Sequence, residues 1–229
     1  MARFPKFSSM LRLLNLSINS LTGSVSISGN LGLEFLVLTG NLFSGAIPPE
    51  LENCSNIRGI SLDSNYLTGT IPGELSDLVH LQYLLPMGNR FSGTIPPELG
   101  NCSNIRGILL DGNDLTGTIP GKLSNLSHLQ QLVLNSNDIG GALPPGLSNC
   151  MELIALWLQQ NRLSGNSIPA SYGKMTLLIF LDVESNNLSR EVPAMLQNVS
   201  TLQFPSQTTA LVAQTGLPCL TNLRAGFLG

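Results

Sequence analysis

The sequence predicts an α/β repeat solenoid, a curved stack of short coils with a parallel β-sheet on its concave side. One observation behind this is a near-duplication, because "ENCSNIRGISLDSNYLTGTIPGELS" (52–76) returns as "GNCSNIRGILLDGNDLTGTIPGKLS" (100–124). Another is an asparagine that recurs every 24 residues, at Asn41, Asn65, Asn89, Asn113, Asn137 and Asn161. Asn19 and Asn186 extend the series with spacings of 22 and 25, which makes eight copies. A fixed period decides the architecture because each unit buries its apolar face only against its neighbours.

Each unit opens with the pattern L-x-x-L-x-L-x-x-N, and its alternating apolar residues, as in "IRGISL" and "LQQLVL", indicate a short strand with one buried face. Gly and Pro in the following block, for example "YLTGTIPGEL", indicate a turn and an irregular return path. Leucines of "ELSDL" and "KLSNL" should point back into the core from the far side. Strands stack at about 4.8 Å while the return segments need more room, so the stack should bend with the sheet inside.

The recurrent asparagine closes each strand, where a buried side-chain amide can both donate and accept hydrogen bonds. We expect these amides to satisfy backbone groups at the turn of their own coil and of the adjacent coil. The asparagine series is therefore predicted to be structural.

These repeats resemble the plant-specific class of leucine-rich repeats, whose unit reads L-x-x-L-x-L-x-x-N-x-L-[ST]-G-x-I-P-x-x-L-x-x-L. The resemblance covers residues 11–203 as about eight 24-residue coils, between a lead-in without a recognisable cap (1–10) and a non-repeat tail (204–229). It implies a leucine-rich repeat horseshoe or superhelix with a concave parallel β-sheet, a second short strand at "LTG", and short 3-10 or irregular convex segments. Such arrays form the extracellular parts of plant receptor kinases and receptor-like proteins, and also secreted inhibitors of fungal cell-wall enzymes. The activity implied is recognition.

Composition disfavours several other classes of function. Charged residues make up 11% of the chain, the net charge is −3, and Lys and Arg form no run, so a nucleic-acid partner is not expected. No apolar stretch reaches the length of a membrane span, and "MARFPKFSSMLRLL" lacks the apolar centre of a signal peptide. Kinase signatures and the phosphate-binding G-x-x-x-x-G-K-[ST] motif are absent from the sequence. We expect membrane contact only through parts outside this chain.

Side chains that point out of the concave sheet are not needed to pack the core, so they are the ones that can bind a ligand. The slot after the second strand leucine is apolar in four adjacent coils, and we expect this stripe to stand in water with Trp157 as its anchor. Tyr83 lies between glycines in the preceding slot, which should leave both faces of its ring open. The candidate ligand-binding residues are Phe35, Arg58, Asp63, Tyr83, Leu85, Arg106, Leu109, Asp111, Val133, Trp157, Gln159, Phe180, Asp182 and Glu184.

A peptide with a basic group and an apolar side chain would suit this face. Asp63, Asp111 and Glu184 form an acidic column, while Arg58 and Arg106 enter from the strand starts. An equally good interpretation of the apolar stripe is that apolar residues simply favour parallel strands.

One pair of carboxylates has a spacing that could suit catalysis. Asp63 and Asp111 lie two coils apart, about 10 Å, which is near the upper end for an inverting glycosidase. Any polar slot in a solenoid produces such pairs, so we predict no catalytic residues and no enzyme activity.

Cysteines and histidines give no sign of a metal or cofactor. Cys54, Cys102 and Cys150 recur 48 residues apart in a core slot. Two strand spacings, about 10 Å, separate them, which is too far for a disulfide. We expect them to be buried and reduced; Cys219 lies in the tail without an evident partner. His80 and His128 share one slot and should be exposed to solvent.

Six N-x-[ST] sequons begin at Asn15, Asn53, Asn101, Asn125, Asn187 and Asn198. Together with the resemblance they favour glycosylation and an extracellular or cell-surface location. A glycan on Asn15 would lie on a concave strand.

Pro86 stands where the third strand leucine is expected, and since proline has no amide proton the ladder should be interrupted there. The sequence as a whole favours a non-catalytic module that recognises a peptide, hormone or protein ligand, with a co-receptor as a second partner, as part of a plant receptor-like kinase or receptor-like protein. A secreted polygalacturonase-inhibitor-like protein and a non-functional truncated receptor fragment remain as alternatives.

Overall fold

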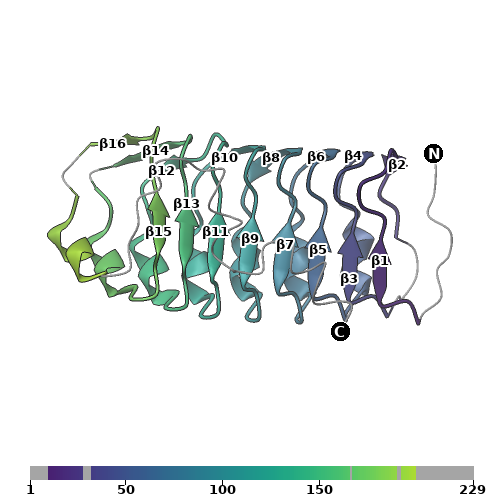
Figure 1. Cartoon of the computed structure of the whole chain (residues 1–229), viewed down its shortest axis with the longest axis horizontal. Helices are drawn as coiled ribbons and strands as arrows, with labels where there is room; N and C mark the ends of the chain where they lie inside the picture. Colours follow the sequence, from purple (N-terminus) through teal and green to yellow (C-terminus); the bar gives the residue numbers. More distant parts are fainter. Residues whose placement is uncertain (1–9, 28–31, 166, 190–191, 200–229) are drawn as a thin grey trace.

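A computed structural model describes residues 10–27, 32–165, 167–189 and 192–199. Within this part the chain forms an elongated stack of coils, with one strand of each coil lying side by side along the array (Figure 1). The predicted solenoid is therefore confirmed. Except for Met10, the predicted lead-in and tail lie outside the described residues.

The concave sheet is parallel throughout, and its strands follow chain order. Its strands are β1 (Leu13–Asn15), β3 (Phe35–Val37), β5 (Gly59–Ser61), β7 (Tyr83–Leu85), β9 (Gly107–Leu109), β11 (Gln131–Val133), β13 (Ala155–Trp157) and β15 (Phe180–Asp182). The middle residue of each strand points into the core, and Leu84, Ile108 and Leu132 are each 0% exposed. This alternation is the pleat expected for a strand with one face on the core.

A second set of short parallel strands runs along another edge of the stack (Figure 1). They are β2 (Thr22–Ser24), β4 (Leu42–Gly45), β6 (Tyr66–Gly69), β8 (Arg90–Thr94) and β10 (Asp114–Thr116), then β12 (Gly140–Gly141), β14 (Arg162–Gly165) and β16 (Asn187–Leu188). The glycine of the "TGT" segments has a positive φ, for example +83° at Gly69 and +77° at Gly117. Only glycine adopts this conformation readily, which accounts for its recurrence.

From the return path after β4 onward, each return path contains one short 3-10 segment that begins directly after a proline. The segments are η1 (Pro49–Asn53), η2 (Gly73–Asp77), η3 (Pro97–Asn101), η4 (Gly121–Asn125), η5 (Pro145–Asn149), η6 (Ala170–Lys174) and η7 (Ala194–Asn198). The preceding prolines, such as Pro72 and Pro120, are extended, with φ near −65° and ψ near +130°. Leucines of these segments, among them Leu75 and Leu123, are buried, so the core is closed from the far side as predicted.

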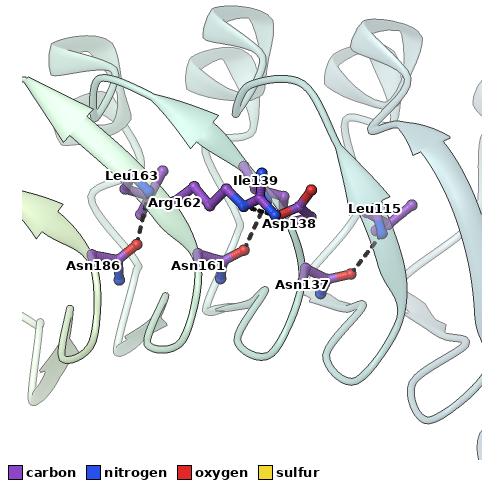
Figure 2. Close-up of polar contacts among 8 residues, drawn as sticks. All are labelled: Leu115, Asn137, Asp138, Ile139, Asn161, Arg162, Leu163 and Asn186. Atoms are coloured by element: carbon purple, nitrogen blue, oxygen red, sulfur yellow. Dashed lines mark hydrogen bonds and ion pairs between the residues drawn. The ribbon is translucent and has the colours of Figure 1, made fainter.

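The recurrent asparagines form a continuous ladder. Asn113 is typical, because its Oδ1 accepts the N–H of Phe91 at 3.0 Å while its Nδ2 donates to the carbonyls of Leu110 (2.9 Å) and Pro86 (3.2 Å). Figure 2 shows three successive links of this kind, from Asn137 to Leu115, Asn161 to Ile139 and Asn186 to Leu163. From Asn41 onward each amide joins its own coil to the preceding one, which confirms the predicted structural role, whereas the hydrogen bonds described for the side-chain amide of Asn19 lie within its own coil.

Pro86 interrupts the concave sheet at a single bond. The register between β7 and β9 has two pairs where most neighbouring strands have three. Leu62 and Leu110, the equivalents of Pro86 in the flanking coils, each donate their N–H to the next strand at 3.0 and 2.8 Å. Pairing resumes two residues later, where Gly88 donates to the Asp111 carbonyl at 2.8 Å. The predicted interruption is confirmed, and it is local.

Gly100 in η3, like Gly173 in η6, lies at a very close approach to the backbone of the next coil. A methyl group added there would overlap the carbonyl oxygen of Lys122 and lie 2.8 Å from its carbonyl carbon. Backbone cannot yield as a flexible side chain does, so the Gly100→Ala variant should lose about 1 to 2 kcal/mol of unfolding free energy through overpacking. Gly121→Ala is the matched control, because nothing lies within 4 Å of the added methyl group. It should be neutral or gain up to about 1 kcal/mol; equal urea midpoints for both variants would contradict the assignment.

Candidate functional site

The predicted apolar stripe exists, but most of it does not stand in water. Leu85, Leu109 and Val133 are only 3 to 6% exposed because they pack against one another across adjacent strands. Half-buried Tyr83, Met87 and Trp157 pack against them. We call these six residues the concave apolar cluster. The expectation of an exposed stripe was wrong for its centre, and the surface open to a ligand is the partly buried rim.

Aromatic rings of the concave face lean over neighbouring glycines. A Cβ added to Gly107 would lie 3.0 Å from Cδ1 of Tyr83, and one added to Gly59 would lie 2.9 Å from Cδ1 of Phe35. Tyr83 therefore covers the Gly107 backbone with one side of its ring. The expectation that both faces of the ring are open to solvent was wrong. A side chain at position 107 would displace this ring.

Asp63 is buried and engaged within the protein. Its Oδ1 accepts hydrogen bonds from Thr39 Oγ1 at 2.6 Å and Ser61 Oγ at 2.7 Å, and the carboxylate is only 5% exposed. The two hydroxyl donors come from residues that lie 2 and 24 positions before Asp63 in the sequence, and both bind the same carboxylate oxygen. Of the predicted acidic column, Asp63 is the member least available to a ligand.

Asp111 occupies the same slot two coils later, with the opposite environment. The positions equivalent to Ser61 and Thr39 are Leu109 and Met87, neither of which can donate a hydrogen bond to a carboxylate. Oδ1 of Asp111 is buried without a hydrogen-bond partner. Burial, with a smaller contribution from the charge of Asp63, raises the pKa of Asp111 to about 6.

Three further buried polar atoms, on the two coils that follow Asp111, also lack a hydrogen-bond partner. They are Oδ1 of Asn135, Oε1 of Gln159 and Nε1 of Trp157. Gln159 was among the predicted candidates, whereas Asn135 was missed. The signal that could have found Asn135 is its spacing, since it lies 24 residues after Asp111 and 24 before Gln159.

The remaining candidates are spread along the same face. Phe180 and Asp182 of β15 are 4 and 6% exposed, and the Asp182 carboxylate accepts the N–H of Glu184 at 3.0 Å. Glu184 itself is exposed. Arg58 and Arg106 are exposed at the strand entries, and Arg58 pairs with Glu34 at 3.5 Å. The arginines therefore lie at the opposite ends of the strands from Asp111.

The cysteine prediction is confirmed for the described residues. Cys54, Cys102 and Cys150 are buried, and Cys102 and Cys150 are free thiols. Burial raises the pKa of the Cys102 and Cys150 thiols to about 11, which keeps both protonated at neutral pH. Cys219 lies outside the described residues.

His128 is exposed as predicted, and it has a partner that the sequence did not reveal. Its Nδ1 lies 2.9 Å from Oε1 of Glu152 in the next coil. This hydrogen bond, more than any other contact, lowers the pKa of the Glu152 carboxyl. Both side chains are about half exposed, so the pair is a surface contact. A second surface pair joins Arg162 to Asp138 (Figure 2).

Five of the predicted sequons have exposed asparagines, namely Asn15, Asn53, Asn101, Asn125 and Asn187. The side chain of Asn198 lies outside what the structure describes. Glycosylation remains a prediction. Within the described ranges, no group of three or more His, Cys, Asp and Glu side chains converges as metal ligands would. None of the helices described is both long and apolar enough to cross a membrane.

Comparison with known proteins places the chain in a family. The Leucine Rich Repeat family model matches residues 32–54, 56–78 and 128–150. In the BIR3–SERK2 complex from Arabidopsis thaliana, a chain 31% identical has 70% of its length matched, over 58% of this chain, with a TM-score of 0.51. The chain belongs to the plant-type leucine-rich repeat family. No curated protein sequence matches this leucine-rich repeat chain.

Two peptide receptors resemble this leucine-rich repeat chain over most of its length. The plant peptide hormone receptor RGFR1, in complex with RGF2, is 36% identical over 85% of this chain and 31% of its own, with a TM-score of 0.81. The Arabidopsis receptor kinase HAESA, in complex with the peptide hormone IDA and the co-receptor SERK1, is 30% identical over 90% of this chain and 40% of that chain, with a TM-score of 0.68. The leucine-rich repeat chain thus corresponds to less than half of either receptor chain.

Proposed function

We propose that this chain is a ligand-sensing leucine-rich repeat module that binds an extended peptide along its concave sheet, as part of a receptor-like kinase or receptor-like protein at the cell surface. A co-receptor is the second partner that the resemblance to HAESA supports. The observation that carries the proposal is the concave apolar cluster, a second group of packed apolar side chains on the face of the sheet opposite the main core. Catalysis has no part in it.

The rim of this cluster supplies what peptide recognition needs. Tyr83 and Trp157 are large, partly buried rings at its two ends, and both are held in place by packing. Aromatic anchors of this kind carry much of the binding energy in protein interfaces because little rotamer freedom is lost on binding. Polar side chains at the carboxyl ends of the same strands can then fix the direction of a peptide.

The test begins with linear peptides selected on the full chain from a random library. Tyr83→Ala and Trp157→Ala should each weaken the selected peptides about tenfold or more, measured by calorimetry. Leu177→Ala removes an apolar side chain that is 51% exposed and lies outside the concave face, after η6, and should leave binding unchanged. Loss of affinity in the Leu177 variant alone would overturn the proposal.

A polygalacturonase-inhibitor-like function is the alternative, because it uses the same kind of array. Inhibition of a fungal polygalacturonase by the purified chain, measured as reducing ends released from pectate, separates the two. Stoichiometric inhibition would favour the alternative. A chain that neither selects peptides nor inhibits the enzyme would fit the remaining alternative, a non-functional receptor fragment.

A further inference from the structure

One region of the concave face carries buried polar atoms that the protein itself leaves unsatisfied. Asp111, Asn135 and Gln159 each bury a side-chain oxygen without a hydrogen-bond partner, and Trp157 buries its indole N–H in the same way. We call the first three the acceptor row. Buried polar atoms are nearly always paired in folded proteins, so four in one region need a physical reason.

The three members of the acceptor row lie side by side on successive coils. Gly112 donates its N–H to the Asn135 carbonyl at 3.0 Å, and Ser136 donates to the Gln159 carbonyl at 3.0 Å. This pairing continues the parallel ladder, so the three side chains leave the sheet about 4.8 Å apart. Trp157 ends strand β13 two residues before Gln159, on the same face.

Each member of the acceptor row buries one oxygen, although Asp111 and Asn135 as whole residues are only partly buried. Gln159 is only 6% exposed. Leu109 and Met87 stand at the positions that hold the hydroxyl donors of Asp63, and both belong to the concave apolar cluster, so neither side chain can donate to Asp111. No ion pair in the described part of the chain includes Asp111. The row therefore presents three hydrogen-bond acceptors, one of them a carboxylate, without a cation beside them.

We propose that the acceptor row binds a nitrogen cation of a peptide ligand, a group that only donates hydrogen bonds, while the indole N–H of Trp157 donates to a backbone carbonyl of the same peptide. This deepens the proposed function and rests on it. Lysine, arginine and a free amino terminus share the required chemistry, with three to five N–H donors and no acceptor. The alkyl stem of such a residue can lie on the concave apolar cluster while its charged end reaches the row. Charge-assisted hydrogen bonds to a carboxylate screened from water are the stronger kind.

The experiment uses the one tryptophan of the chain as its reporter. The full-length chain is titrated with acetyl-leucyl-arginyl-leucinamide, with its lysyl analogue, and with glycyl-leucyl-leucinamide, which offers a free amino terminus. The citrullyl peptide is the neutral match for arginine. Affinity is read from the indole N–H resonance of Trp157 and from its fluorescence. At least one cationic peptide should bind about tenfold more tightly than the citrullyl peptide, and the ranking identifies the preferred source of the cation.

Asp111→Asn should abolish this preference and leave the affinity for the citrullyl peptide unchanged. Asp114→Asn is the control, because Asp114 is an exposed carboxylate of the same coil on β10, away from the concave face. It removes the same charge and should keep the preference. Equal binding of cationic and neutral peptides, or a preference that survives in Asp111→Asn, would overturn the inference. Binding without charge preference would still leave the proposed peptide-binding function standing, so the two failures are distinguishable.

Discussion

Replacement of Asn113 by leucine is expected to lower the free energy of unfolding by about 3 kcal/mol, the upper end of the penalty for leaving a buried polar group without a partner. Asn113 is 8% exposed, and its Oδ1 accepts the N–H of fully buried Phe91. Leucine has a similar volume but no acceptor. Water cannot replace the lost oxygen inside a closed core.

The carbonyl groups that Asn113 serves lose less, because the ladder is redundant on that side. The Leu110 carbonyl still receives the amide of Asn137 at 3.0 Å, and the Pro86 carbonyl still receives that of Asn89 at 3.1 Å. Only the Phe91 N–H loses its acceptor outright. The expected loss is therefore that of one donor left without an acceptor plus weakened contacts, not the sum of all the bonds that Asn113 makes.

Urea unfolding followed by circular dichroism measures this loss. Asn149→Leu is the control, because Asn149 is exposed at the end of η5, and it should change the stability by less than about 0.5 kcal/mol. Indistinguishable midpoints for the Asn113 and Asn149 variants would show that the ladder does not stabilise the stack.

The regular repeat made the fold predictable from the sequence, because an error in assigning the strand of one coil is revealed by comparison with the seven other coils. Strand positions, the asparagine ladder, the buried cysteines and the gap at Pro86 all follow from slots that recur along the chain. Each of these features depends on backbone geometry that every coil shares. That is why the sequence was sufficient for them.

The concave face was less predictable, because its side chains respond to neighbours in adjacent coils. Apolar residues about 4.8 Å apart bury one another, so Leu109 is 5% exposed where the sequence alone indicated an open stripe. Asp63 and Asp111 share a slot, yet hydroxyl side chains donate to Oδ1 of Asp63, whereas Oδ1 of Asp111 has no hydrogen-bond partner. The residues 2 and 24 positions earlier decide which case applies, and a comparison of those slots could have separated the two from the sequence.

Replacement of Asp111 by asparagine is expected to stabilise the free protein by up to about 3 kcal/mol at pH 7.5. Burial raises the pKa of the Asp111 carboxyl to about 6 in the folded chain, whereas aspartate in an unfolded chain titrates near 3.9. A difference of about two pH units corresponds to about 3 kcal/mol. Asparagine has nearly the same shape without the charge that burial penalises.

The gain should depend on pH in a defined direction. Between pH 4 and 6 the folded wild-type chain holds the Asp111 proton more tightly than the unfolded chain does. The contribution of Asp111 to the free energy of unfolding therefore falls as the pH rises. Below pH 4 both states are protonated and the variant should gain little. Asp63 is the charged group that adds to the raised pKa, while neutral Met87 and Asn135 occupy the slot in the two flanking coils. Unfolding at pH 4.0 and pH 7.5 therefore measures the effect, with Asp114→Asn as the matched charge change.

Equal stability of the wild type and the Asp111→Asn variant at pH 7.5 would mean that the carboxylate has a partner in solution, and the proposed cation site would lose its physical basis. If the gain is observed, the free protein retains a carboxylate that destabilises it. A bound cation would relieve this penalty, because it favours the ionised form that burial disfavours. The preferred cationic peptide should then raise the melting temperature of the wild type more than that of the variant at pH 7.5. Because stabilisation by a ligand reports its affinity for the folded state, this difference would measure how much of the binding depends on Asp111.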